Sequence, residues 1–176
     1  MRILIAEDEY DIALLYKTAL EERNHHIVIT ENGEECLKVY HEEFQRLRLE
    51  TYIQGSVSPF DVIILDHKMP KINGLDVAEE ILAVNSHQRI IFASAYVKET
   101  LIDSIRHLKQ VVELIQKPFT ISKLIDTIED EQVYMQLRKL NVDIDVIKAI
   151  NPTHEQIMDL LQGLRKTEKE SSNFLV

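Results

Sequence analysis

The chain has 176 residues, with 45% apolar and 28% charged side chains and a formal net charge of -10. This balance is typical of a globular protein and differs from that of a disordered chain. Acidic side chains number 30 against 20 basic ones, which argues against a chain that coats nucleic acid or an anionic membrane, because both partners need a basic surface.

The sequence favours a cytoplasmic location. The only cysteine, Cys36, excludes an internal disulfide bond and is interpreted as a small core residue. No apolar run approaches the roughly 20 residues that span a bilayer. Acidic residues from Glu7 onward come too early for a signal peptide. We therefore expect a soluble, cytoplasmic chain without a membrane segment.

Strand and helix patterns alternate from residue 2 to about residue 139. Short apolar runs predict strands at residues 3–6, 27–30, 60–65, 89–94 and 111–116. Helical spacing predicts helices at residues 12–19, 34–50, 74–84 and 97–107, and a fifth helix that Thr120 caps. The first helix is expected to carry an apolar stripe of Ile12, Leu15, Tyr16 and Ala19.

Strands that alternate with helices favour a parallel sheet covered on both faces, with right-handed crossovers. The predicted fold class is therefore α/β, with a doubly wound, five-stranded parallel sheet of flavodoxin-like order 2-1-3-4-5 and a C-terminal helical extension. The binding crevice is expected at the carboxyl ends of the strands. The expected domains are residues 1–130 and 131–176.

The extension is predicted to be helical because the strand patterns stop near residue 140. A short helix is expected from near Asp143 until Asn151-Pro152 breaks it. Thr153 and Gln156 form a capping-box pattern that predicts the start of a last helix. Residues 169–173 are expected to fray at the end of the chain.

Polar residues occur at the predicted carboxyl ends of four strands. Glu7 and Asp8 follow the first strand, Asp66 ends the third, Ser94 ends the fourth and Lys117 ends the fifth. Because the carboxyl ends of parallel strands share one edge of the sheet, the fold would bring these side chains into one crevice.

The chemistry of this set favours phosphoryl transfer. Carboxylates packed together repel one another, and a divalent cation removes this conflict. Oxygen ligands favour Mg²⁺, and phosphoryl transfer needs such a metal together with further positive charge. We interpret Asp66 as the phosphoryl acceptor and Glu7, Asp8 and Asp66 as the metal site. Ser94 and Lys117 then bind the phosphoryl oxygens.

These stretches resemble the receiver domain of two-component response regulators. The matching residues, in chain order, are Ile3-Leu4-Ile5-Ala6-Glu7-Asp8-Glu9, Asp66-x-x-Met69-Pro70-x-x-x-Gly74, Ser94-Ala95 and Lys117-Pro118-Phe119. The resemblance covers residues 1 to about 130. It implies that a histidine kinase or a phosphotransfer protein donates the phosphoryl group to Asp66, and that the domain slowly hydrolyses its own aspartyl phosphate.

The resemblance also implies a division of roles at the metal. Asp8 is expected to ligate Mg²⁺ directly, Glu7 largely through water, and the backbone carbonyl of Lys68 to complete the site. The expected output surface is the fourth helix, the fifth strand and the fifth helix. Two features depart from the family pattern. Leu114 stands where the family often has an aromatic switch residue, with Tyr96 as a substitute. The stretch at residues 42–59 is longer than usual and is interpreted as an extended helix and a partner contact.

The predicted function is a phosphorylation-operated switch that acts through protein contacts and is not an enzyme beyond slow self-dephosphorylation. A homodimer through the fourth and fifth helices or through the extension is one form of output. DNA binding by the extension is disfavoured, because it lacks the excess of basic residues that a DNA-binding helix needs.

Other classes of function stay open as alternatives. One is a metal-dependent phosphatase or phosphotransferase, although Asp66-His67-Lys68 lacks the second acid of an Asp-x-Asp pattern. Another is a receiver-like scaffold that never accepts phosphate, against which the intact acidic and lysine set argues. His67 is interpreted as a surface loop residue, and the histidines show no paired spacing for zinc.

Overall fold

The computed structural model describes residues 1–50, 58–95, 112–150 and 152–173. The chain divides into two compact units, Met1–Ile121 and Ser122–Val176. The sequence-based division at residue 130 concerns functional domains and stays a prediction. The expected helix at 97–107 and the substitute switch residue Tyr96 lie outside the described residues.

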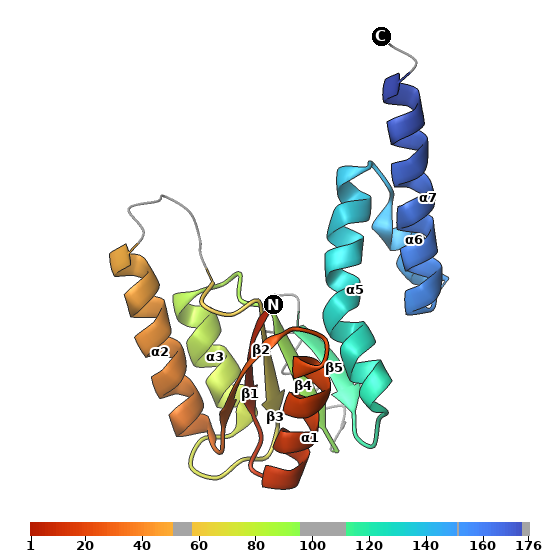
Figure 1. The fold of residues 1–176 in the computed structure, drawn as a ribbon. Helices are drawn as coiled ribbons and strands as arrows, with labels where there is room; N and C mark the ends of the chain where they lie inside the picture. The colour runs from red at the N-terminus through yellow and green to blue at the C-terminus, as the bar shows by residue number, and fades with distance from the viewer. Residues whose placement is uncertain (51–57, 96–111, 151, 174–176) are drawn as a thin grey trace. The chain divides into compact units, whose positions relative to one another are not determined.

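A five-stranded parallel sheet of order β2-β1-β3-β4-β5 organises the first unit, which confirms the predicted fold class (Figure 1). The strands are β1 (Arg2–Ala6), β2 (His26–Thr30), β3 (Val62–Asp66), β4 (Ile90–Ser94) and β5 (Val112–Gln116). In the parallel register Asp66 lies opposite Ala93, and Ser94 opposite Gln116. The carboxyl ends of these strands therefore meet at one edge of the sheet.

Among the described residues of this unit, three helices cover the sheet: α1 (Tyr10–Glu21), α2 (Gly33–Glu50) and α3 (Gly74–Val84). Figure 1 shows α2 and α3 on one side of the sheet and α1 on the other. Leu4, Ile63 and Leu65 share a buried core cluster with α2 and α3. Alternate residues such as Ile5 and Ile64 point to the opposite face and are equally buried. Burial on both faces explains the continuous apolar runs.

The predicted inward stripe of α1 is wrong at one position. Leu15 is 54% exposed, whereas Ala13, Tyr16 and Leu20 are buried. Consecutive residues are about 100° apart around a helix, so Leu15 and Tyr16 cannot both occupy the centre of the buried stripe. The pattern of apolar residues left two phases open, and packing against the sheet selected the one that contains Tyr16.

Side-chain caps fix where two helices begin. The Asn73 side chain accepts hydrogen bonds from the backbone N–H groups of Leu75 and Asp76, at 2.9 and 3.0 Å. The Asn32 side chain accepts one from the backbone N–H of Glu35 at 3.0 Å. Capping satisfies donors that have no partner inside the helix. It therefore sets the position of the loops that lead into α2 and α3.

The second unit contains α5 (Ile121–Lys139), α6 (Ile144–Ala149) and α7 (His154–Asn173). Its small core consists of Val133, Tyr134, Leu137, Ile144, Ile157 and Leu161. The predicted capping box is confirmed, because Thr153 N–H donates to Gln156 Oε1 and Gln156 N–H donates to Thr153 Oγ1. Within the described residues, no helix has the length and apolar content needed to cross a membrane.

α7 continues to Asn173, through the stretch 169–173, and the expected fraying of this stretch stays a prediction. Lys169 and Glu170, at the start of this stretch, have high helix propensity, which favours a helix that continues here.

Candidate functional site

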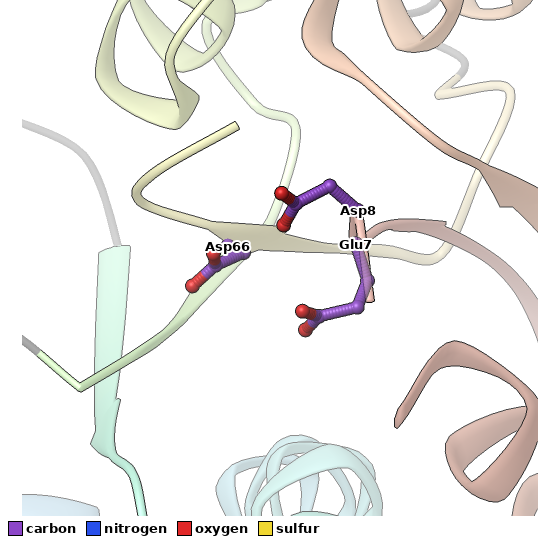
Figure 2. Close-up of side chains that lie close together, drawn as sticks. All are labelled: Glu7, Asp8 and Asp66. Carbon is purple, nitrogen blue, oxygen red and sulfur yellow. The ribbon is translucent and has the colours of Figure 1, made fainter. Parts of the chain in front are cut away.

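The site is centred on three carboxylates. Oxygens of Glu7, Asp8 and Asp66 lie within 4.8 Å of one another. Figure 2 shows these carboxyl groups together, with Glu7 and Asp8 on the segment that follows β1 and Asp66 at the end of β3. The parallel pairing of Ala6 with Leu65 places the two strand ends next to each other. The sheet therefore brings together acids that are far apart in the sequence.

Lys117 supplies a cation to this cluster. Its Nζ donates to Glu7 Oε2 at 2.7 Å and to Asp66 Oδ1 at 3.4 Å. The side chains of Lys117 and Asp66 are only 15% and 13% exposed. The backbone N–H of Lys117 donates to the carbonyl of Ser94 at 2.8 Å, which joins the segment after β5 to the end of β4. The lysine is thus fixed at the same edge of the sheet as the acids.

Glu7 is the most deeply buried of the acids, at 2% exposure. Burial raises the pKa of Glu7 to about 7, although the hydrogen bond and charge of Lys117 oppose this shift. Burial lowers the pKa of Lys117, but the hydrogen bonds and charges of Glu7 and Asp66 together outweigh this effect and raise the pKa overall. One cation faces several carboxylates, so the cluster retains an excess of negative charge.

The donor set fits a hard divalent cation. Glu7 Oε1 is buried and has no hydrogen-bond partner within the described part of the chain. A buried carboxylate oxygen without a partner is costly unless a cation or water reaches it. The three carboxylates offer oxygen ligands alone, which Mg²⁺ prefers. The residues present therefore fit Mg²⁺, and Glu7, Asp8 and Asp66 are the side chains that would hold it.

A pocket of about 210 Å³ opens above the carboxylates. Its lining residues are Asp8, Glu9, Asp66, Lys68, Ser94, Ala95 and Lys117. This lining contains every candidate residue from the sequence except Glu7, which lies buried beside Lys117. Glu9 and Ala95 were not singled out as site residues, although both follow directly on ones that were. The pocket has room for a phosphoryl group beside Asp66.

The loop from His67 to Asn73 follows directly after Asp66 and lies next to the pocket. It is closed by a hydrogen bond from the N–H of Gly74 to the carbonyl of His67, at 3.0 Å. A Cβ at Gly74 would lie 2.1 Å from the backbone oxygen of Asp66, so no other residue fits without a shift. His67 lies in this loop as predicted, but it is partly buried.

Aromatic packing supports the segment after Lys117. The rings of Tyr16 and Phe119 stack with centroids 5.7 Å apart and an interplanar angle of 22°. Burial, and then the charges of Glu7 and Asp66, raise the pKa of Tyr16 far above its ordinary value. The Tyr16 hydroxyl therefore stays neutral and its ring acts as packing. Leu114, in place of the family's aromatic residue, is partly buried against the core shared with α2 and α3.

Comparisons with known proteins agree with this geometry. The family model for the response regulator receiver domain matches residues 3–129. The chain is 27% identical to the response regulator receiver protein CpdR of Brucella abortus, over 73% of this chain and 93% of that protein. It is 26% identical to the chemotaxis protein CheY of Listeria monocytogenes, over 73% of this chain and 96% of that protein.

A solved structure of a relative carries a ligand. The response regulator protein TrrA of Thermotoga maritima, determined in complex with Mg²⁺ and BeF, is similar with a TM-score of 0.53 and 29% identity. The match covers 73% of this chain and 96% of TrrA.

Proposed function

Because this chain belongs to the family of response regulator receiver domains, whose members act in two-component signalling, we propose that Asp66 accepts a phosphoryl group from a histidine kinase or a phosphotransfer protein. Phosphorylation of Asp66 then changes the contacts that the protein makes with other proteins. The observation that carries the proposal is the set of three carboxylates within 4.8 Å of one another, next to a partly buried lysine and an open pocket.

The reaction follows from the position of Asp66 in the pocket. A carboxylate oxygen of Asp66 forms a bond to phosphorus while the bond between phosphorus and the donor's imidazole nitrogen breaks, which leaves an acyl phosphate. The proton that the imidazole needs comes from solvent, because the pocket is open. Lys117 lies beside Asp66 Oδ1 and offsets the negative charge that arrives with the phosphoryl group.

Mg²⁺ would supply further positive charge to the phosphoryl oxygens. Asp8 would hold it directly, with Asp66, and Glu7 would act through water, with the backbone carbonyl of Lys68 as an additional ligand. Asp8, Asp66 and Lys68 line the pocket, and Ser94 lines it from the end of β4. The hydroxyl of Ser94 would donate a hydrogen bond to the phosphoryl group.

The switch itself is a local electrostatic event. Phosphorylation adds roughly two negative charges at Asp66, which draws Lys117 and Ser94 toward the new oxygens. An equilibrium shifts only through contacts that differ between the two states. Signalling through protein contacts, with the extension at residues 131–176 as a docking or dimerisation element, is part of this proposal, as are the cytoplasmic location and the absence of a turnover activity beyond slow self-dephosphorylation.

The test is incubation with Mg²⁺ and acetyl phosphate, followed by intact mass spectrometry and size-exclusion chromatography. The wild type should gain a single phosphoryl group and Asp66→Ala none. Asp159→Ala removes an exposed acid of α7 and should react like the wild type. Absence of a phosphoryl adduct in the wild type, or continuous hydrolysis of a generic phosphate ester, would overturn the proposal. Earlier elution of the labelled protein would identify dimerisation as the output.

A further inference from the structure

Gly33, the first residue of α2, lies against the loop that follows Asp66. A Cβ built at Gly33 would be 2.2 Å from the carbonyl oxygen of Ile72 and 2.8 Å from Cγ2 of Val77. Gly33 does not have a positive φ, so glycine is required here for space and not for its backbone conformation. The closest atom belongs to backbone, which has no rotamer by which to move away.

The loop contacted by Gly33 behaves as one closed piece. The N–H of Ile72 donates to the carbonyl of Pro70 at 2.8 Å, across Lys71 with its φ of 66°. The N–H of Gly74 donates to the carbonyl of His67 at 3.0 Å. The second of these hydrogen bonds joins the two ends of the loop, so we expect a displacement at Ile72 to reach the segment that carries Lys68.

The first turn of α2, which carries Gly33, is also fixed in position. The carbonyl of Asn32 accepts the N–H of Cys36, and the Asn32 side chain caps Glu35. Cys36 is fully buried in the core, which fixes the first turn of α2. Next to this contact, Glu34 of α2 and Lys71 of the loop form an exposed ion pair, with Oε2 and Nζ 2.6 Å apart. Two independent contacts therefore join the start of α2 to the loop.

We infer that Gly33 is a positioning residue. Its contact with Ile72 holds the loop after Asp66 where the Lys68 carbonyl can bind Mg²⁺. This inference rests on the proposed function. Cβ atoms essentially never come within 3.0 Å of another atom, so an added methyl group would displace the Ile72 carbonyl. Mg²⁺ demands near-ideal octahedral geometry, and supporting residues of metal sites typically change affinity about 10- to 100-fold.

The test measures Mg²⁺ binding by calorimetry without any phosphoryl donor, on the full chain. Gly33→Ala should raise the Mg²⁺ dissociation constant about tenfold or more, and phosphoryl uptake should recover as Mg²⁺ is raised. Gly163→Ala is the matched control, since a Cβ there would meet nothing within 4 Å. It should bind Mg²⁺ like the wild type. A thermal melt of each variant shows that the measured protein is folded.

Charge variants extend the test in case Gly33→Ala does not fold. Glu34→Lys and Lys71→Glu each break the exposed ion pair, and each should weaken Mg²⁺ binding up to about fivefold. A purely long-range charge effect would instead move the two variants in opposite directions. Combining both substitutions restores the pair and should restore the affinity.

The outcomes separate the two proposals. If the wild type neither binds Mg²⁺ nor gains a phosphoryl group, the proposed function fails and the role of Gly33 fails with it. If the wild type does both, but folded Gly33→Ala binds Mg²⁺ equally well, only the positioning role is overturned. Opposite effects of the two charge variants, or no recovery in the double variant, would likewise overturn it.

Discussion

The carboxyl edge of the sheet and the helical second unit differ in how closely their glycines and ion pairs are packed. At the edge, Gly74 is in contact with backbone, whereas Gly163 in α7 has open space around it. The ion pair of Lys117 with Glu7 is nearly inaccessible, whereas that of His154 with Asp130 keeps 23% and 22% side-chain exposure. The edge is thus closely packed around its charged groups, whereas the helical unit is packed more loosely around its own.

Under the proposed function, the groups at the edge would serve a reaction, whereas those of the helical unit serve stability. Burying a carboxylate that keeps an oxygen without a partner works against folding. Such an arrangement is expected where a ligand completes it, as with Glu7 Oε1 at the edge. Asp130 is also partly buried, and burial raises its pKa, but His154 contacts it and no further ligand is needed.

The largest effect is expected for Gly74→Ala. The new methyl group would lie 2.1 Å from the Asp66 carbonyl oxygen and displace the acceptor itself. Misplacement by about 1 Å can reduce a rate roughly 100-fold, so phosphoryl uptake should fall by about that factor. Overpacking should lower the free energy of unfolding by about 1–3 kcal/mol. Intact mass against time and urea unfolding measure the two effects. A folded variant with the wild-type rate would contradict the claim that close packing at Gly74 positions Asp66.

Glu7→Gln tests the buried charge through pH. Burial raises the pKa of Glu7 from 4.5 to about 7. A carboxyl group with a higher pKa in the folded chain contributes stability that is complete below its unfolded pKa and lost as pH rises through its folded pKa. The metal-free wild type should therefore lose stability between pH 4.5 and 7. Glu7→Gln should be more stable at alkaline pH by about 3 kcal/mol.

Urea unfolding in the presence of EDTA, repeated across this pH range, measures the slope for both proteins. Glu113→Gln is a suitable control, because it removes a carboxylate that pairs with Arg89. This pair lies near the amino ends of β4 and β5, away from the carboxyl edge that holds Glu7. Parallel pH profiles for the wild type and Glu7→Gln would rule out Glu7 as the source of the dependence.

His154→Ala tests the helical unit. The substitution leaves Asp130 partly buried without its 2.5 Å partner. The free energy of unfolding should fall by about 1 kcal/mol, while phosphoryl uptake should keep the wild-type rate. Asp130→Asn in the same background should recover part of the loss, because a neutral amide is less costly to bury. A change in the rate of uptake would show that this pair takes part in the reaction.

Gly163→Ala should give the smallest effect, and one of opposite sign to Gly74→Ala. Its new methyl group meets no neighbour, and alanine has the higher helix propensity. Stability should rise by about 0.5–1 kcal/mol without a change in phosphoryl uptake. Thermal unfolding of the full chain measures it. Destabilisation would mean that this face of α7 is covered in solution.

The sequence by itself determined the alternation of strands and helices and the order of the site residues along the chain. Runs such as Val62–Leu65 predict buried strands because both of their faces are apolar, and the polar residue that ends each run marks the edge where strands meet. The start of the last helix at Thr153 was predicted from its capping-box pattern for a similarly local reason, since a cap is a property of a few adjacent residues.

Only the tertiary structure decided which face of α1 turns inward, how deeply Glu7 is buried and how closely Gly33 approaches the loop after Asp66. These properties depend on atoms that are distant in sequence, so periodicity and spacing carry no information about them. A carboxylate at the end of a strand looks the same in the sequence whether solvent or a lysine from another strand faces it. The close packing of segments brought together by the sheet makes that difference.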